Sequence, residues 1–253
     1  QGGVGKTTFA LNGQLGKVLV IIPENDGGAY AINNLSNEIK GNVDAMVLEI
    51  GKSPISALVK AFIANADNYD TIVVDPFTNI RNEQALFLRK QDGKSLTSQK
   101  HWGQVKEQFS EMMKVLIKYR TQKNIIIVAH EEVRSVQDDI TGVTSTAIQP
   151  ALGTLNTMLG QYADEIFRLT LNSNAEGKIE RKFDFGSDIV FGKTRKFKER
   201  HKINMNINDI IGNTIEVTEE VVKQNDITVD EIVENTKKIE EEIKNATKWW
   251  NSH

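Results

Sequence analysis

The first residues of the chain combine glycines, a lysine and two hydroxyl side chains at the spacing of a phosphate-binding loop. Residues 1–8 read Gln-Gly-Gly-Val-Gly-Lys-Thr-Thr, which matches the Gly-Lys-Thr end of the P-loop pattern. Glycines let successive backbone N–H groups point at one phosphate, Lys6 can reach the β- and γ-phosphates, and the Thr7 hydroxyl can ligate Mg²⁺. The pattern predicts a nucleoside triphosphate with Mg²⁺, and a glycine-rich turn without a ligand is the alternative. The expected phosphate-binding residues are Gly2, Gly3, Val4, Gly5, Lys6, Thr7 and Thr8.

Three further polar side chains follow apolar runs that read as parallel strands. Asp75 ends Thr-Ile-Val-Val-Asp, Glu24 follows Val-Ile-Ile-Pro, and His130 ends Ile-Ile-Ile-Val-Ala-His. The carboxyl ends of parallel strands meet at one edge of a sheet, where a P-loop also lies. We therefore expect Asp75 to hold Mg²⁺ together with Thr7, Glu24 to polarise the attacking water, and His130 to sense the γ-phosphate.

Each of these side chains also has an interpretation without chemistry. Asp75 could merely end a strand, whereas Glu24 and Asp26 could be solvated turn residues. A lone histidine is more often a structural hydrogen-bonding residue than a sensor. After a P-loop the metal role is favoured for Asp75, and Asp26 remains a second candidate for the base.

A basic segment stands out in a chain whose formal net charge is −3. Residues 193–202 contain six Lys or Arg side chains among ten positions. Lys193 and Arg195 could stabilise transition-state charge on a neighbour's γ-phosphate, and the other cations could contact phosphates of single-stranded nucleic acid. A solvated basic hairpin edge is the alternative. Trp102 and Phe197 could stack on exposed bases, but they could equally belong to the core.

The elements that would position these side chains alternate along the chain. Apolar, β-branched runs alternate with helix-like segments, which is typical of a mostly parallel α/β sheet with helices on both faces. In the helix expected at residues 102–120, apolar side chains recur every three or four positions and predict one buried face. The expected strands are 17–22, 45–50, 71–75, 124–129 and 165–171, and the other expected helices are 7–14, 29–38, 53–66, 79–90 and 151–162.

The second half of the chain is less regular. Residues 133–149 are polar without a usable period and read as a loop. The runs 165–171, 178–185 and 188–191 predict antiparallel strands at the edge of the sheet. Residues 229–250 carry an amphipathic helical pattern that favours packing on its own domain or a neighbouring subunit over a free coiled coil.

Composition narrows the class of protein. The chain has 253 residues, 39% of them hydrophobic, and no cysteine, so disulfides and thiolate zinc sites are excluded and a reducing cytoplasm is expected. The longest apolar runs have five residues, too few to span a bilayer. The negative net charge argues against a protein that coats nucleic acid through its overall charge.

Taken in order, these motifs resemble those of RecA-like P-loop ATPases of bacteriophages, including core-only recombinases of the single-strand-annealing kind. The resemblance covers about residues 1–217 and predicts a core over that range, with a C-terminal helical extension over 218–253. It implies a RecA-like fold whose first strand would precede Gln1. It also implies that ATP is the nucleotide, that Glu24 activates water, and that Lys193 and Arg195 act across a subunit interface.

The function that this resemblance implies is ATP hydrolysis by an oligomer on single-stranded DNA. Rings or filaments, and phage replication or recombination proteins as partners in the host cytoplasm, are expected with it. A partition-type ATPase is an alternative, although Gln1 stands where that family has lysine and Pro23-Glu24 lies in place of its Asp-rich motif. A nucleotide-binding scaffold without turnover is a second alternative. No membrane association is expected.

Overall fold

The computed structural model describes residues 5–13, 15–24, 26, 32–33, 35–49, 53–137, 144–174 and 176–211. The predictions for Gly2, Gly3 and Val4 lie outside these residues, as does the amphipathic helix predicted at 229–250. Residues 29–31 and 34 of the helix predicted at 29–38 also lie outside them. The domain boundary after residue 217 therefore stays a prediction.

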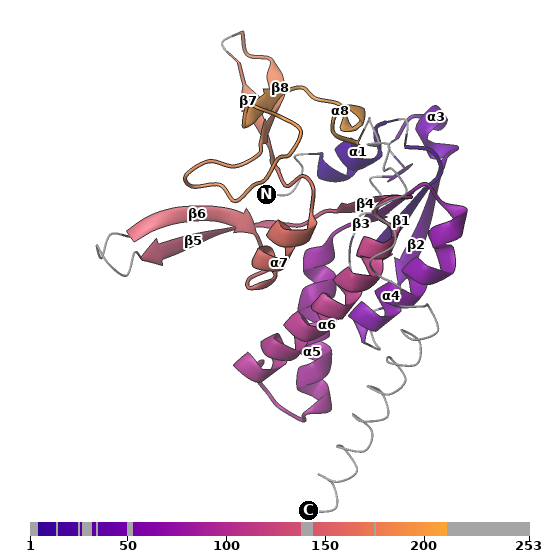
Figure 1. Cartoon of the computed structure of the whole chain (residues 1–253), viewed down its shortest axis with the longest axis vertical. Coiled ribbons are helices and arrows are strands. Elements are labelled where there is room, and N and C mark those ends of the chain that lie inside the picture. The colour runs from indigo at the N-terminus through magenta and orange to yellow at the C-terminus, as the bar shows by residue number, and fades with distance from the viewer. Residues whose placement is uncertain are drawn as a thin grey trace, which may run out of the picture. The chain divides into compact units, whose positions relative to one another are not determined.

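A parallel sheet of four strands, in the order β2-β1-β3-β4, forms the centre of the described chain (Figure 1). All positions of β1 and β3 are buried, as expected of parallel strands covered on both faces. This confirms the parallel sheet predicted from the apolar runs. The strands are β1 (Val18–Pro23), β2 (Val43–Leu48), β3 (Thr71–Val74) and β4 (Asn124–Ile127).

Side chains of the sheet alternate between two hydrophobic clusters, one on each face. Ile21 and Val74 pack with residues of α4, α5 and α6, whereas Val20 and Val73 pack with Phe9 of α1 and with residues of α8. The sheet therefore has a helical layer on each side, as predicted. The helices are α1 (Lys6–Leu11), α3 (Asn37–Lys40), α4 (Pro54–Asn65), the short 3₁₀ helix η1 (Ala66–Asn68), α5 (Phe77–Gln91), α6 (Gln99–Tyr119), α7 (Leu155–Tyr162) and α8 (Ile207–Ile211).

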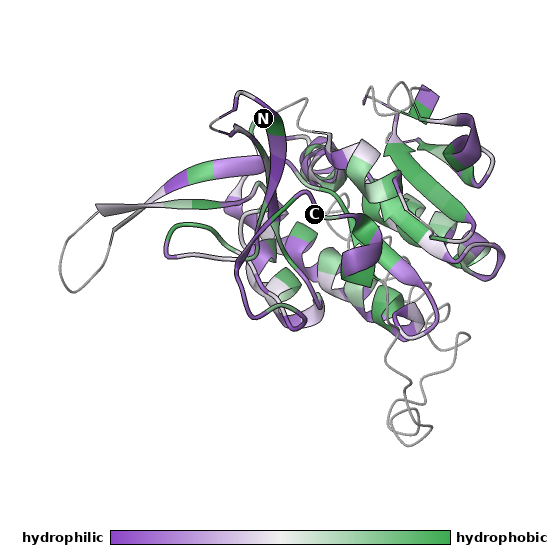
Figure 2. Ribbon diagram, turned by 90° about the horizontal axis from the view of Figure 1, so that it is seen from above, coloured by the Kyte–Doolittle hydropathy of each residue, from purple (hydrophilic) through white to green (hydrophobic). Residues whose placement is uncertain are grey.

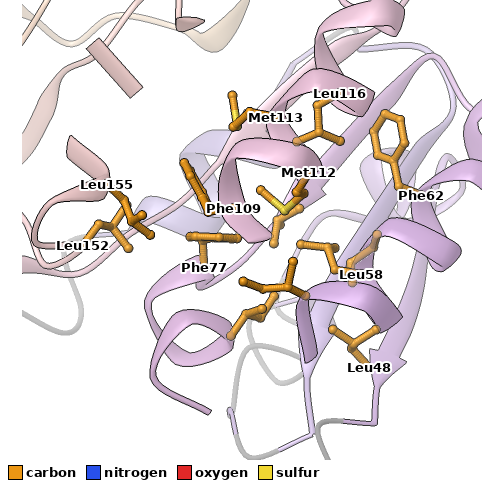
Figure 3. Packing of buried hydrophobic residues seen from close by; sticks show 14 of the residues in the cluster. Leu48, Leu58, Phe62, Phe77, Phe109, Met112, Met113, Leu116, Leu152 and Leu155 are labelled. Atoms are coloured by element: carbon orange, nitrogen blue, oxygen red, sulfur yellow. The ribbon is translucent and has the colours of Figure 1, made fainter. Parts of the chain in front are cut away.

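The α6 helix buries one face, as its sequence period predicts. Val105, Phe109, Met112 and Leu116 are buried, and Phe109 lies against Phe77 of α5 with ring centroids 5.1 Å apart (Figure 3). The opposite face of α6 is polar, so packing on the sheet accounts for its apolar stripe. Among the described helices, none combines the length and apolar character needed to cross a membrane.

The prediction of a loop over residues 133–149 is wrong. The structure has an antiparallel hairpin there, formed by β5 (Glu131–Gln137) and β6 (Thr144–Pro150), with Glu131 opposite Pro150. Figure 1 shows it as a ribbon extending away from the central sheet, and Figure 2 shows it with less hydrophobic colour than the sheet. Its positions 133–135 and 144–146 are exposed whichever face of the ribbon they lie on, so this part needs no alternation of apolar and polar residues and its sequence lacks the period of a buried strand.

The antiparallel pairing predicted between 165–171 and 178–185 is confirmed, but their predicted placement at the edge of the central sheet is wrong. Strands β7 (Arg168–Ser173), β8 (Ile179–Asp184) and β9 (His201–Ile203) form a separate antiparallel sheet. Of the strand predicted at 188–191, only Val190 makes a bridge, to Ile148. Leu169 and Phe183 of this sheet are buried in the same cluster as Phe9. The strands are thus held by packing on α1 rather than by a ladder to the central sheet.

Replacing Phe109 by alanine should test the packing of α6. The ring is fully buried against Phe77, so truncation should lower the free energy of unfolding by about 3–5 kcal/mol. Urea unfolding followed by circular dichroism measures this loss. Lys106→Ala on the exposed face of the same helix is the control and should change the free energy by less than about 0.5 kcal/mol. Equal losses in both variants would contradict the packing described.

Candidate nucleotide-binding site

The predicted site residues follow strands that end side by side. Ile21 of β1 pairs with Val74 of β3, which pairs with Ile127 of β4, so the residues after these positions reach the same edge of the sheet. Asp75 follows β3 directly, Glu24 follows β1, and His130 lies three residues beyond β4. The strand register thus delivers the three predicted side chains to one edge.

The start of α1 depends on the backbone of Gly5. Gly5 has φ 81° and ψ 31°, in the left-handed region that favours glycine, and its carbonyl accepts the hydrogen bond from Phe9 N–H at 2.8 Å. The helix that follows buries Phe9, Ala10 and Leu11 against the sheet. The chain therefore turns sharply at Gly5. Because α1 is packed against the sheet, its first two residues, Lys6 and Thr7, are held in place beside Gly5.

The closest contact of the site joins the P-loop helix to the end of β3. The Thr7 hydroxyl donates a hydrogen bond of 2.5 Å to Oδ2 of Asp75, a side chain that is only 6% exposed. A hydroxyl and a carboxylate are hard oxygen ligands of the kind that Mg²⁺ binds, usually together with phosphate oxygens. Their placement fits the predicted metal site, with Thr7 and Asp75 as the residues that would hold Mg²⁺.

The charges around Asp75 show which side chains gather there. Burial raises the pKa of Asp75 above its ordinary value, and the negative charge of Asp26 raises it further. The hydrogen bond from Thr7 and the positive charges of Lys6 and His130 act in the opposite direction and lower this pKa. Lys6, Thr7, His130 and Asp26 therefore all lie close enough to influence one buried carboxylate.

The two candidate bases differ in their surroundings. The Glu24 side chain is exposed at the end of β1, where its backbone N–H donates to Leu48 of β2 at 3.1 Å. Asp26 is half-buried and accepts a hydrogen bond from Nδ2 of Asn79 at 3.0 Å. Asp26, rather than Glu24, is the carboxylate whose charge acts on Asp75. The structure thus brings Asp26 into the cluster and leaves Glu24 at its exposed margin.

The backbone of His130 is held on both sides. Its N–H donates to Oγ1 of Thr78 at 3.0 Å, and its carbonyl accepts from the N–H of Ala151 at 2.7 Å. The next residue, Glu131, forms two hydrogen bonds with Arg168 at 2.8 and 3.2 Å, and this pairing holds the pKa of Glu131 below its ordinary value. His130 is therefore anchored between α5 and the root of the hairpin.

Lys193 and Arg195 make their recorded contacts elsewhere. Lys193 Nζ donates to the carbonyls of Gly160 and Ala163 at 2.9 and 2.6 Å, at the C-terminal end of α7. Burial lowers the pKa of Lys193, and the charge of Arg195 lowers it further. Arg195 forms an exposed ion pair of 2.9 Å with Asp164. Neither residue is among the charges that influence Asp75.

The two aromatic side chains considered for base stacking are occupied by protein contacts. The guanidinium of Arg81 lies 4.2 Å from the ring centre of Trp102. Phe197 packs against Phe185, with ring centroids 5.0 Å apart, and belongs to the cluster around α1. Both rings therefore serve the packing of the protein in this structure.

Sequence reasoning missed three residues that hold the site together. Asn79 binds Asp26, Thr78 binds the backbone of His130, and Arg168 binds Glu131. Thr78 and Asn79 lie in the first turn of α5, three and four residues after Asp75. Their closeness in sequence to the carboxylate that ends β3 was a signal from which both residues could have been predicted. Arg168 had none, because its partner lies 37 residues away.

Replacing Asp75 by asparagine should stabilise the protein without ligands at neutral pH. The folded chain binds the proton of Asp75 more tightly than the unfolded chain, where the pKa is near 3.8. The charged carboxylate thus lowers the free energy of unfolding above its folded-state pKa, and this cost disappears as the pH falls. Asp75→Asn should therefore gain stability at about pH 8 and lose that gain below about pH 4.

Urea unfolding across this pH range, without nucleotide or metal, measures the difference. Asp67→Asn, at an exposed position of η1, is the control for removal of a surface charge. An Asp75→Asn variant no more stable than the parent at about pH 8 would show that Asp75 is not strained by its burial.

A comparison with protein families agrees with this geometry. A family model described as an AAA domain matches residues 1–203. No curated protein was found to match the chain. The match includes the P-loop, the strand that ends at Asp75 and the segment that carries His130, and it ends at the last residue of β9. The chain belongs to the AAA-domain family and carries a P-loop nucleotide-binding domain of that type.

Proposed function

We propose that the protein hydrolyses ATP at the edge of the sheet where Lys6, Thr7 and Asp75 converge, and that it works as an oligomer on single-stranded DNA. The observation that carries hydrolysis is the placement of Lys6, Thr7 and His130 around the buried Asp75. This arrangement combines a cation for the phosphates, two oxygen ligands for a metal and a residue at the γ-phosphate side.

In this mechanism each side chain has one role. Lys6 binds the β- and γ-phosphates, and Thr7 and Asp75 hold Mg²⁺, which neutralises charge on those phosphates when it is bound. Glu24, exposed at the margin of the site, accepts a proton from the attacking water. Asp26 is fixed by Asn79 beside Asp75 and orients the groups around the metal ligands. His130 donates to the γ-phosphate and reports its presence to the hairpin that begins at the next residue.

The basic segment supports the DNA and oligomer parts of the proposal. Lys198 and Arg200 are exposed, so their charges are available to phosphates of a nucleic acid. Arg195 is suited to reaching a neighbouring subunit, because breaking its exposed pair with Asp164 costs less than about 1 kcal/mol. Lys193 must instead leave two carbonyls of α7 before it can act outside its own chain.

Lys6→Ala should abolish ATP turnover, because no other charge would replace the ammonium on the β- and γ-phosphates. Phosphate release, measured with and without single-stranded DNA, should fall to the background of the assay. The control is Lys17→Ala, which removes an exposed lysine paired with Asp44 at the opposite end of β1 and should retain turnover. Turnover in Lys6→Ala would overturn the assignment of the site. ATP binding without phosphate release in the parent protein would indicate a nucleotide-binding scaffold.

Comparison of Glu24→Gln with Asp26→Asn should identify the residue that activates water. Glu24→Gln should lower kcat by about 10²–10⁴-fold with little change in KM, because it removes the proton acceptor but leaves the phosphate contacts. Asp26→Asn should have the smaller effect on kcat, since the asparagine amide can still bond to Asn79. The reverse order of the two effects would transfer the role of the base to Asp26.

A further inference from the structure

A cavity of about 320 Å³ lies beside α1, on the side of the helix that faces the β7-β8-β9 sheet. Thr8 of α1 and Asn12, the residue after α1, line one wall, and Arg181 of β8 with Asn204 and Asn206 after β9 lines the other. Its volume lies at the lower end of the range for small-molecule sites. The cavity is close to the phosphate-binding residues but does not include Lys6 or Asp75.

Arg181 connects this cavity to the phosphate-binding loop. A Cβ atom placed on Gly5 would lie 3.4 Å from Nη2 and 3.6 Å from Nε of Arg181, so the guanidinium rests against the glycine that precedes Lys6. Asn204 fixes the backbone of Arg181 from both sides. The Arg181 N–H donates to Oδ1 of Asn204 at 3.0 Å, and the Asn204 N–H donates to the Arg181 carbonyl at 2.8 Å.

The α1 helix presents its hydroxyls to two different regions. Thr7 donates to Asp75, whereas the next residue, Thr8, lines the cavity together with Asn12 one helical turn further on. A molecule whose phosphates lie at Lys6 and Thr7 can therefore continue past Thr8 into the cavity. Arg181 stands at the boundary between the two regions.

The lining of the cavity suits a flat heteroaromatic group that carries both donors and acceptors. The amide of Asn12 can donate and accept hydrogen bonds. The Oδ1 atoms of Asn204 and Asn206 accept from the N–H groups of Arg181 and Asn208, which orients their Nδ2 groups as donors. Phe9 and Met205 add apolar surface to the walls. Polar groups that fix orientation within partly apolar walls are typical of small-molecule sites.

We propose that this cavity binds the base and sugar of the nucleoside triphosphate and that Arg181 contacts the phosphate nearest the sugar. This inference rests on the proposed function, which places the terminal phosphates at Lys6. It assigns nucleotide selectivity to Asn12, at the end of the P-loop helix, and to the segment after β9, which is well apart in sequence from the P-loop motif. The positive charge of Arg181 would thus act on a nucleotide bound to its own chain, not on one bound to a neighbouring subunit.

Binding of ATP and of inorganic tripolyphosphate tests the proposal, because the second ligand has three phosphates but neither base nor sugar. Isothermal titration calorimetry with Mg²⁺ on the full chain gives both affinities. Asn12→Trp fills the cavity from an exposed position, so ATP affinity should fall by at least about tenfold while tripolyphosphate affinity is unchanged. Asn68→Trp, at an exposed position of η1, is the control for the same substitution elsewhere.

Arg181→Ala should weaken both ligands, because its guanidinium contacts a phosphate that both contain. Lys182→Ala, the adjacent lysine on the opposite face of β8, is its control and should weaken neither. Unchanged ATP affinity in Asn12→Trp would overturn the placement of the base, even if Lys6→Ala loses both ligands as the proposed function requires. Retained binding of both ligands in Lys6→Ala would overturn the proposed function itself.

Discussion

The hydrogen bond between Thr7 and Asp75 joins parts of the chain that lie 68 residues apart, and the arrangement of the site depends on it. One partner begins a helix of six residues, too short to hold its place without the burial of Phe9 and Leu11. The other ends a strand that is buried at all four positions. Apolar packing of α1 and of β3 therefore holds the polar side chains of Thr7 and Asp75 together at one edge of the sheet, where β3 ends and α1 begins.

Because Asp75 is buried, the free-energy cost of its negative charge must be offset by the groups around it. A carboxylate removed from water is disfavoured in its charged form, and the neighbouring Asp26 adds to that cost. Lys6, His130 and the Thr7 hydroxyl offset part of it, and a bound metal would offset more. A buried carboxylate with a raised pKa is typical of functional sites, which agrees with the role proposed for Asp75 in holding Mg²⁺.

The parts of the structure that could be predicted are those with a local physical cause. Five apolar side chains at helical spacing identified the buried face of α6, and continuous β-branched runs identified β1 and β3. The β5–β6 hairpin could not be found in this way, because its outer positions, 133–135 and 144–146, are exposed and carry no period. Contacts such as Arg181 with Gly5 or Arg168 with Glu131 arise only when distant segments pack together. Spacing along the chain therefore identified the P-loop, Asp75, Asp26 and His130, but not the side chains of Thr78, Asn79 and Arg168 that hold this part of the structure together.

The β5–β6 ribbon has a mechanical consequence. Its root is joined to the site through the carbonyl of His130 and the pair of Glu131 with Arg168, and Ile148 of β6 bridges to Val190. Farther out, the ladder in the described part of the chain connects the two strands to each other. Residues 144–147 of β6 extend beyond this bridge and make a lever about 14 Å long, so a tilt of about 10° at Ile148 would carry its outer end by roughly 2 Å. A displacement at the sheet edge too small to disturb the core would thus be magnified several-fold at the far end of the arm.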